Sequence, residues 1–507
     1  MNNKVRVRFA PSPTGALHIG GVRTALYNYL FAKKHGGDFL LRIEDTDQTR
    51  FVPGAEEYIR KSLHWLGINP VESPWDGGES APYRQSERKP MYKQYAQQLI
   101  DSGFAYYAFD TPKELEEMRE RLTEARVVNP QYSVITRLTM KNSLSLSKEE
   151  VDAKLASGEP YVIRLKVPKK EEVRLNDMIR GWVKVLSSDI DDKILMKSDG
   201  MPTYHLANVV DDHLMKITHV IRGEEWLPSA PCHVLLYKFL GWESTMPQFA
   251  HLPLILKPDG NGKLSKRSAD QLGFPIFPID WTEPSTNDFS NGFKEKGYLP
   301  DALLNFLAFL GWNPGTEQEL FQLDELVEAF SIERINKAGT KFDIDKLNWF
   351  NQQYIKSKTN EELSKEILVQ TKEAKIDCSE SQAIKVAGLF KERVTFPTQF
   401  LEKALFLFQS PTVYDEQVVK KKWSPEIAEV MQELAIKISE TDFSGEVVKE
   451  LLQQVAESKG MNLGKVMQPL RMAITGEGNG PELVDVLDFL GKEEVVNRLN
   501  KAVLSIV

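Results

Sequence analysis

Apolar and polar residues alternate from Val5 to Phe9, the pattern of a half-buried strand. A helical run follows over about residues 20–35, and the two glycines after it are typical of a helix end. Apolar residues at 39–43 then predict a second strand. A strand, a helix and a strand in this order form a parallel β-α-β unit, whose ligands bind beyond the carboxyl ends of the strands.

The hydrophobic pattern changes twice further along the chain. Short mixed segments with many charges fill residues 105–190 and predict an inserted domain, whereas from about residue 320 onward apolar positions recur at helical spacing. In that region Ser424 and Pro425 mark a helix start, an N-cap serine followed by proline at the first helical position. A stretch rich in Pro, Asn, Ser and Gly at 274–296 predicts a loop insertion. Further helices are expected at 55–66, 88–102, 229–240 and 300–310, and strands at 194–196 and 217–222.

Composition places the chain among ordinary folded proteins. Of its 507 residues, 41% are hydrophobic and 27% are charged, which excludes a disordered chain, a collagen-like fibre and a small disulfide scaffold. The net charge of −8 argues against a basic protein, but residues 1–50 carry eight basic residues against four acidic ones, and Lys420–Lys422 form a second cluster. Because a nucleic acid needs a basic face rather than a basic protein, we expect these segments to supply one.

Cysteine usage points to a reducing compartment. Cys232 and Cys378 lie far apart, so no C-x-x-C pair exists and a thiolate zinc site is not expected. The first eight residues are polar and basic, which does not resemble a signal peptide. No apolar run approaches the ~18 residues of a membrane span. We therefore expect a cytoplasmic protein that does not enter a membrane.

Two motifs suit the phosphates of a nucleotide. The first, residues 11–21, places small residues, His18 and a helix N-terminus after the first strand, so that free N–H groups would face an anion. The second runs from Lys263 to Arg267 and holds two lysines three positions apart, a clamp for a departing pyrophosphate. The alternatives are a glycine-rich turn with a surface histidine and a solvated charge run. A Walker loop is excluded because its four-residue spacer is missing.

Two further motifs suit a small charged substrate. Glu44, Asp45 and Asp47 follow the second strand and could bind an ammonium group, a ribose or Mg²⁺, or form only a cap or salt bridge. Arg222 ends a later strand, where a guanidinium could pair with a carboxylate. The acids and histidines at 211–219 lack the H-E-x-x-H spacing, and we predict no metal site there.

These motifs, in this order and spacing, resemble those of class I aminoacyl-tRNA synthetases, and the combination with residues 202–208 and 221–226 resembles bacterial glutamyl-tRNA synthetases closely. The resemblance covers nearly the whole chain. Residues 310–349 are similar to the family's tRNA-stem-contacting region, and residues 468–476 to its helical anticodon domain.

The resemblance implies a fold and a set of domains. The fold is α/β, a Rossmann-like parallel-sheet catalytic core with an inserted α+β acceptor-binding domain, followed by all-α stem-contact and anticodon-binding domains. The implied boundaries are 1–104 for the first half of the catalytic domain, 105–190 for the insertion, 191–325 for the second half with the Lys263–Arg267 loop, and 326–507 for the helical part.

The resemblance also assigns residues to roles. Catalysis would involve His18, Lys263 and Lys266. ATP, as its Mg²⁺ complex, would contact His18, Gly20, Gly21, Lys263, Ser265, Lys266 and Arg267. Glutamate would contact Arg8, Ala10, Ser12, Glu44, Tyr204, Asn208 and Arg222, with Arg222 or Arg8 on its side-chain carboxylate and Glu44 on its ammonium. Arg393 and Arg471 are exposed-cation candidates for tRNA.

Two departures from the family pattern limit which contacts to ATP and to zinc the resemblance implies. The first motif ends in Gly21 where many class I enzymes have histidine, so only backbone contact to ATP is expected there. Some relatives hold zinc through cysteines of the insertion, whereas residues 98–140 contain none, so we predict no zinc.

The function implied is a glutamate--tRNA ligase that forms glutamyl-adenylate with ATP and transfers glutamate to tRNA(Glu), acting as a monomer. Glutaminyl-tRNA synthetase is the nearest alternative, but its anticodon region is a β-barrel, unlike the helical pattern here. A truncated tRNA-modifying relative, a small-molecule adenylyltransferase and a non-catalytic tRNA-binding paralogue remain as further alternatives.

Overall fold

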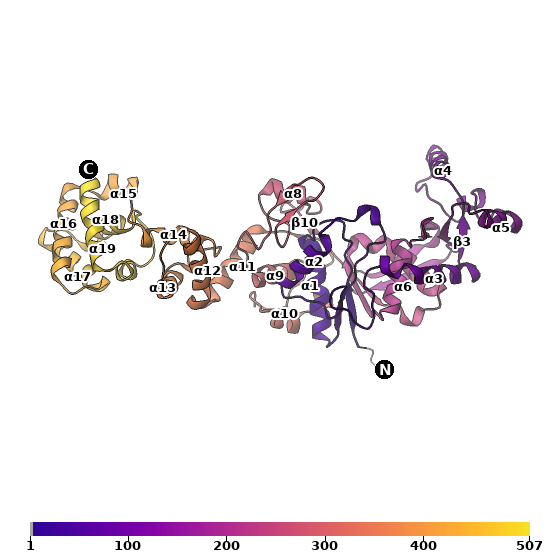
Figure 1. Ribbon diagram of the computed structural model, residues 1–507, viewed down its shortest axis with the longest axis horizontal. Helices are drawn as coiled ribbons and strands as arrows, with labels where there is room; N and C mark the ends of the chain where they lie inside the picture. The colour runs from indigo at the N-terminus through magenta and orange to yellow at the C-terminus, as the bar shows by residue number, and fades with distance from the viewer. Residues whose placement is uncertain (1–3, 507) are drawn as a thin grey trace. The chain divides into compact units, whose positions relative to one another are not determined.

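The computed structural model describes residues 4–506 and divides the chain into two compact units (Figure 1). The first unit runs up to Glu295 and takes in Pro300–Leu347, and the second is made of Lys296–Leu299 and the chain from Asn348 onward. Each unit has its own hydrophobic core. The motifs predicted to bind a nucleotide and a charged substrate all lie in the first unit, which is described first.

A six-stranded sheet forms the centre of the first unit. Its strand order is β2-β1-β8-β9-β5-β6, and the first four strands run parallel. The strands of this sheet are β1 (Arg6–Phe9), β2 (Asp38–Leu41), β5 (Glu172–Asp177), β6 (Gly181–Leu186), β8 (His219–Gly223) and β9 (Gln248–Leu252). Because Phe9 pairs with Leu41 and Gly223 with Leu252, the carboxyl ends of four strands meet along one edge. The predicted β-α-β unit and its crevice are confirmed.

Two groups of helices pack on this sheet. Helix α1 contacts β1, β2 and β8 and packs against α9 and α10, whereas α3, α6 and α7 form one hydrophobic core with Val220 and Phe249 of the sheet. The helices named here are α1 (Ile19–Lys34), α3 (Lys89–Asp101), α6 (Tyr204–Leu214), α7 (Ala230–Phe239), α9 (Pro300–Phe309) and α10 (Leu323–Ala329). The remaining helices of the unit are α2 (Ala55–Trp65) and α8 (Lys266–Leu272), together with α4 and α5 of the insertion.

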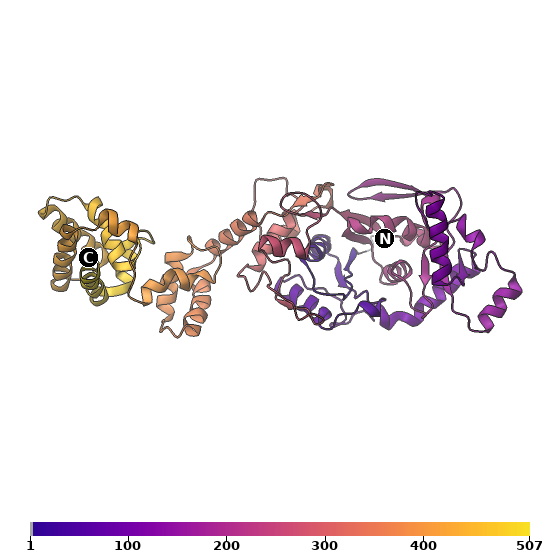
Figure 2. The same cartoon turned by 90° about the horizontal axis from the view of Figure 1, so that it is seen from above.

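The insertion contributes to two sheets. In both views it projects from the sheet with α4 (Pro112–Glu124) and α5 (Lys148–Ala156) at its far end (Figures 1 and 2). Its own antiparallel sheet has the order β3-β4-β7, with β3 (Ala105–Ala108), β4 (Val162–Leu165) and β7 (Ile194–Met196). Its hairpin β5–β6 extends the central sheet, and Asp177 at the end of β5 pairs with Phe249 of β9. The domain boundaries expected from the sequence stay a prediction.

Two short sheets flank the motif at 263–267. Strand β10 (Ile255–Leu256) pairs in parallel with β13 (Thr340–Lys341), and β11 (Trp281–Thr282) pairs with β12 (Phe289–Ser290). The expected loop insertion at 274–296 therefore contains a small hairpin. It is well packed, because Phe274, Ile276, Phe277 and Trp281 are buried.

The second unit is helical. From Asn348 to residue 506 the structure contains helices and connecting turns but no strand. Its helices include the greater part of α11 (Ile344–Ser357), then α12 (Asn360–Glu373), α13 (Glu380–Phe390), α14 (Gln399–Phe408), α15 (Glu416–Lys422), α16 (Pro425–Glu440), α17 (Gly445–Ser458), α18 (Leu463–Thr475) and α19 (Leu483–Ser505). Ser424 caps α16 as predicted, its hydroxyl accepting from the amide of Ile427. The α/β core with an all-helical second unit confirms the predicted fold class.

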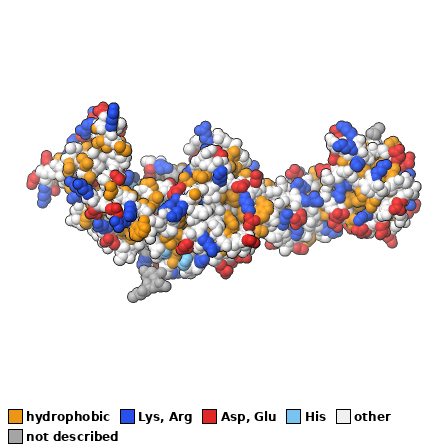
Figure 3. Space-filling model, turned by 180° about the vertical axis from the view of Figure 1, so that it is seen from behind, with side chains coloured by type: hydrophobic (Ala, Val, Ile, Leu, Met, Phe, Trp, Pro, Cys, Tyr) orange, Lys and Arg blue, Asp and Glu red, His pale blue; other side chains and the backbone are white. Residues whose placement is uncertain are grey.

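Half of the basic residues counted in the N-terminal segment do not contribute to a basic face, whereas Lys4, Lys33, Lys34 and Arg50 are exposed. Arg8, Arg23 and Arg42 are buried and bonded to protein acceptors, and the half-buried Arg6 pairs with Asp38. These side chains stabilise the sheet edge instead of forming a surface. On the face drawn in Figure 3, Lys and Arg side chains are interspersed with Asp and Glu. Among the segments expected to be basic, Lys420–Lys422 do lie exposed at the end of α15.

Candidate functional site

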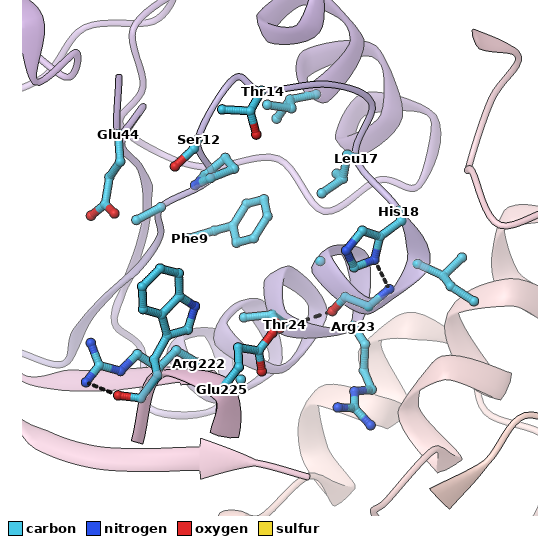
Figure 4. A pocket seen from close by; sticks show the side chains of 18 of the residues that line it. Phe9, Ser12, Thr14, Leu17, His18, Arg23, Thr24, Glu44, Arg222 and Glu225 are labelled. Atoms are coloured by element: carbon cyan, nitrogen blue, oxygen red, sulfur yellow. Dashed lines mark hydrogen bonds between the residues drawn. The ribbon is translucent and has the colours of Figure 1, made fainter. Parts of the chain in front are cut away.

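A cavity of about 630 Å³ opens at the carboxyl ends of β1, β2 and β8. In Figure 4, Glu44 and Arg222 lie on one side of this pocket and His18 lies on the other, with Phe9 between them. Predicted residues that line the pocket are Arg8, Ala10, Ser12, His18, Gly20, Gly21, Glu44, Tyr204, Asn208, Arg222 and Lys263. The strand ends therefore bring together motifs that lie more than 200 positions apart in the sequence.

His18 is the N-cap of α1. Its Nδ1 accepts a hydrogen bond from the Gly20 amide at 3.0 Å, which leaves the proton of the neutral ring on Nε2. A neutral His18 therefore offers a donor to the pocket. The pocket walls shield the His18 ring from water, and this desolvation, together with the Lys263 ammonium, lowers the pKa of His18. The neutral form is therefore favoured.

The expectation of free amides at this helix N-terminus is wrong. The Ile19 amide donates to the carbonyl of Ile276, the Gly20 amide to His18, and the Gly21 amide to the His18 carbonyl. Each of these donors already has a protein acceptor: His18 serves the amides of Gly20 and Gly21, and the segment around Ile276 serves that of Ile19. A phosphate here would have to rely on side chains and the helix dipole, or displace one of these bonds.

Glycine at positions 20 and 21 has a steric reason within the protein. A Cβ on Gly20 would lie 2.8 Å from Cε1 of His18, and one on Gly21 would lie 2.5 Å from Cδ1 of Leu17. The first clash involves a ring held by its capping bond, whereas the second involves the end of a flexible side chain. Gly20 is therefore required for the position of the His18 ring.

Glu44 is held at the end of β2 by two neighbours. Its Oε1 accepts from Arg42 Nη2 at 2.8 Å and from Asn208 Nδ2 at 3.0 Å, and its amide donates to the Pro11 carbonyl. Asn208 comes from α6, one helical turn after Tyr204, so both side chains lie on the face of α6 that meets the pocket. The carboxylate is thereby fixed with one oxygen bonded.

Arg8 lines the pocket but is already paired. Its Nε and Nη2 donate to the two carboxylate oxygens of Asp212, at 2.9 and 3.1 Å, and Asp212 also accepts from Arg42 at 2.8 Å. Burial alone would raise the pKa of Asp212, but the two guanidinium groups outweigh burial and lower it. Arg222 is therefore the better placed of the two arginines predicted for a substrate carboxylate.

Arg222 is bonded on three sides. Its Nε donates to Nε2 of His251 at 3.0 Å, Nη1 donates to the Tyr204 hydroxyl at 2.6 Å, and Nη2 reaches the Trp226 carbonyl at 3.5 Å. Burial raises the pKa of Tyr204 to about 12, so its hydroxyl stays protonated and can donate onward. No carboxylate of the described residues forms an ion pair with Arg222, so the charge of this guanidinium is uncompensated at the pocket wall.

The lysine motif is only partly in the pocket. Lys263 lines it, and its Nζ lies 3.2 Å from Oε1 of Glu225. Ser265 caps α8, and Lys266, the first residue of that helix, lies with its ammonium 5.7 Å from the ring centre of Phe277. Neither of these two, nor Arg267, lines the pocket.

Several residues of the site were missed by sequence reasoning. Glu225 pairs with Lys263, and Asp212 holds Arg8; both stood in quoted motifs, but nothing in their spacing assigns a partner. Arg23 fastens α1 by donating to the carbonyls of Leu310 and Pro253. His251 supports Arg222 from the neighbouring strand, and only the strand register could have shown that pair.

The acids and histidines at 211–219 make contacts with other side chains. Asp211 is buried and accepts from Arg88, Tyr92 and Gln85, and His213 stacks on Trp242 with ring centres 3.7 Å apart. Within residues 4–506 no group of three or more His, Cys, Asp or Glu side chains could hold a metal ion.

The two tRNA candidates lie in the second unit, and one of them is not freely exposed. Arg393 is exposed, whereas Arg471 is half-buried, with Nη1 donating to the carbonyl of Pro481 at 2.5 Å. Arg471 therefore fixes the turn after α18, and the expectation that it is an exposed cation is wrong. No helix in the described part of the chain is long and apolar enough to cross a bilayer.

Comparison with known proteins finds matches along almost the whole chain. Residues 4–349 match the family model described as tRNA synthetases class I (E and Q), catalytic domain, and residues 361–503 match the model described as Anticodon binding domain. A protein of Cytophaga hutchinsonii named Glutamate--tRNA ligase is 59% identical over 507 residues, which is 100% of this chain and 98% of that protein. One of the same name from Amoebophilus asiaticus is 57% identical over 100% of this chain and 99% of its own length.

Solved structures agree with these relatives. A crystal structure of a glutamate tRNA ligase from Elizabethkingia meningosepticum, in complex with its amino acid, has a TM-score of 0.97 and 51% identity, and each chain is covered in full. The glutamate-tRNA synthetase of Elizabethkingia anophelis has a TM-score of 0.93 and 50% identity, with 99% of this chain and 100% of that chain covered.

Proposed function

The chain belongs to the class I tRNA synthetases for glutamate and glutamine, and we propose the following assignment of its pocket to the reaction. The enzyme is a glutamate--tRNA ligase: it activates L-glutamate with ATP, releases pyrophosphate, and transfers the glutamyl group to the 3′ end of tRNA(Glu), releasing AMP. The observation that carries the residue assignment is the separation, within one cavity, of Glu44 and Arg222 from His18 (Figure 4), whose pKa the nearby Lys263 helps to lower.

Glutamate binds at the Glu44–Arg222 side. The Arg222 guanidinium pairs with the side-chain carboxylate, because it lies on the Glu44 side of the pocket and, unlike Arg8, has no carboxylate partner. Glu44 accepts from the ammonium group with the oxygen that Arg42 and Asn208 leave free. Ser12 and Ala10, in the loop after β1, line the same cavity. Glutamine would leave the guanidinium facing a neutral amide, a mismatch worth several powers of ten in selectivity.

ATP binds at the α1 side, as its Mg²⁺ complex. The Nε2 proton of His18 faces the pocket, and Gly20 and Gly21 line the same cavity. Lys263 supplies positive charge at the phosphates once it leaves Glu225. Ser265, Lys266 and Arg267 lie outside the cavity, so we assign them a phosphate role only after the loop closes over bound ATP.

The chemistry then needs no protein nucleophile. An oxygen of the substrate's α-carboxylate attacks the α-phosphorus of ATP, the bond to the β-phosphate breaks, and pyrophosphate leaves. The terminal ribose hydroxyl of tRNA next attacks the carbonyl carbon of glutamyl-adenylate, and AMP leaves with the bonding electron pair. The protein contributes positioning and positive charge where negative charge develops.

The helical second unit supports tRNA recognition. It matches an anticodon-binding family over residues 361–503, and its described residues form no strand, which disfavours the β-barrel expected of a glutaminyl enzyme. Lys420–Lys422 and Arg393 offer exposed cations for the phosphate backbone. We further propose that the enzyme works as a cytoplasmic monomer.

Pyrophosphate exchange tests this proposal. With the full-length protein, ATP and glutamate, we expect exchange of labelled pyrophosphate into ATP when tRNA(Glu) is present, and charging of that tRNA. Glutamine should support neither reaction at the same concentration. Exchange with glutamine but not with glutamate would assign the pocket to the other amino acid, and exchange without any charging would point to an adenylyltransferase.

A further inference from the structure

Three side chains from three neighbouring strands form one hydrogen-bonded chain behind the pocket. Arg222 of β8 and His251 of β9 are register partners, and the Arg222 Nε lies 3.0 Å from the His251 Nε2. On the other side of the ring, the His251 Nδ1 lies 2.6 Å from the Oδ2 of Asp177, the last residue of β5. The side chains of His251 and Asp177 are fully buried. The pocket reaches Arg222 but not the two residues behind it.

The donors along this chain fix the state of the histidine. A guanidinium N–H can only donate, so Nε2 of His251 must accept and must carry no proton. The ring proton is then on Nδ1 and is donated to Asp177 Oδ2. The other oxygen of Asp177 accepts from the amides of Ile179 and Arg180, at 3.0 and 2.8 Å, so the carboxylate cannot turn. Each nitrogen and oxygen atom in the Arg222–His251–Asp177 hydrogen bonds can therefore act only as a donor or only as an acceptor.

We propose that His251 is a positioning residue for Arg222, and that Asp177 sets the tautomer of His251 that lets it do so. This proposal rests on the role of Arg222 given above. Because its Nε is held by His251 and its Nη1 by Tyr204, the guanidinium plane is fixed before substrate arrives. With a proton on Nε2 instead, two donors would face each other across this contact, and Arg222 would have to turn away. The Asp177–His251 pair thus sets how well the site distinguishes a carboxylate from a neutral amide.

Three substitutions separate this role from simple packing. Asp177→Asn keeps the shape, and since the backbone amides require an oxygen at the Oδ1 place, the new amide nitrogen faces His251 Nδ1 and drives the ring proton to Nε2. His251→Asn keeps a donor near the Nδ1 place but provides no acceptor for Arg222. His251→Gln reaches the Nε2 place with an amide oxygen and restores that acceptor.

The experiment is steady-state aminoacylation by the full-length enzyme with saturating tRNA(Glu), varying glutamate and ATP separately. Arg222→Ala calibrates the loss of the guanidinium. We expect Asp177→Asn and His251→Asn to raise the KM for glutamate by about tenfold or more with the KM for ATP within about twofold, and His251→Gln to recover most of that loss. Asp177→Asn and His251→Asn should also reduce the preference for glutamate over glutamine in pyrophosphate exchange.

The outcomes are distinguishable. If Arg222→Ala raises the glutamate KM but Asp177→Asn and His251→Asn do not, the positioning role is overturned. It is also overturned if His251→Gln is as impaired as His251→Asn, or if the KM values for ATP and glutamate rise together, because the pair would then serve only packing. If Arg222→Ala itself leaves the glutamate KM unchanged, the proposed role of Arg222 fails instead.

Discussion

The ammonium of Lys263 and the carboxylate of Glu225 face each other at 3.2 Å on the wall of the pocket. Burial alone would raise the pKa of Glu225, but its own backbone amide and the neighbouring Lys263 lower it, so the pair is charged at neutral pH. Both groups are about half exposed, and such a pair contributes little to stability. It instead holds the lysine near the site until a stronger anion replaces Glu225.

Lys263→Met should therefore reduce the rate of activation and not the stability. Removing one preorganised charge from a developing phosphate is expected to lower kcat by about 10²-fold. Rapid-quench measurement of adenylate formation would check this. Glu225→Gln is the matched control, since it removes the partner and keeps the lysine. An equal loss of rate in Glu225→Gln would mean that the pair acts as a unit.

Arg222→Ala should impair glutamate binding selectively. Loss of a charge-assisted pair with the substrate carboxylate is expected to raise the KM for glutamate by about 10²-fold or more, with the KM for ATP nearly unchanged. Arg119→Ala is the control, because Arg119 is an exposed arginine of α4 paired only with Glu116. An unchanged glutamate KM in Arg222→Ala would remove Arg222 from the amino-acid site.

The buried pair of Arg8 and Asp212 should matter for stability. Asp212→Ala leaves two buried guanidinium groups, those of Arg8 and Arg42, without this carboxylate and is expected to cost about 3–5 kcal/mol. Arg8→Ala should cost less, because Asp212 keeps its bond to Arg42. Urea unfolding followed by circular dichroism would measure both. The reverse order of the two losses would contradict this account of the network.

Gly20→Ala should disturb the His18 cap. The added Cβ requires the ring to move, and loss of the capping bond is expected to cost about 1 kcal/mol and to slow activation. Gly464→Ala is a matched control, since Gly464 is likewise the second residue of a helix, α18, and its Cβ would lie an ordinary 3.5 Å from Asn462. Thermal unfolding and pyrophosphate exchange would be measured for both. Full activity in Gly20→Ala would show that the ring position is not needed.

Acid should destabilise the enzyme through His219, a half-buried histidine that is neutral in the folded protein. Burial lowers the pKa of His219 from 6.5 to about 4, so between these two pH values the unfolded chain binds a proton that the folded chain does not. The contribution of His219 to the free energy of unfolding is fully present above pH 6.5 and is lost as the pH falls toward 4. It amounts to at most about 1.4 kcal/mol for each unit by which the pKa is shifted. Urea midpoints at several pH values should fall less steeply for His219→Asn than for His64→Asn, a change at an exposed histidine of α2. Equal slopes would exclude His219 as the cause.

The sequence predicted the main elements well because their signals are local. The alternation from Val5 to Phe9, the glycines that follow α1 and the cap at Ser424 each depend on a few neighbouring residues, and all three predictions agree with the structure. The position of β5 could not be predicted in this way. In the sequence this strand lies within the insertion, but in the structure it joins the central sheet. The residues of β5 carry no pattern that shows which distant strand they pair with.

A site residue could be predicted from its motif where its side chain is left free for a substrate. It could not be predicted where a distant residue of the protein binds the same side chain. Glu44 and Arg222 stand at strand ends, so topology alone directs them to the crevice. Arg8 has the same position, but Asp212, which lies 204 positions away, binds its guanidinium. Local charge in the sequence misled for the same reason, since most of the early arginines are buried against acids and carbonyls supplied by later segments.

The hydrogen bond from the Ile19 amide to the Ile276 carbonyl has a consequence for how this protein can be altered. The segment at 274–296 is bonded to the rest of the unit near its start, where Ile276 bonds to α1 and Ile279 to the Tyr58 hydroxyl, and it is closed on itself by the bond from the Gly292 amide to Asp280. Its exposed tip at 284–288 contacts only itself in these bonds. Peptide tags or fluorophore sites can therefore be spliced into the tip, whereas a change of length between 276 and 280 would shift the start of the helix that carries His18. Lineages should differ in loop length at the tip and hardly at all at its anchors.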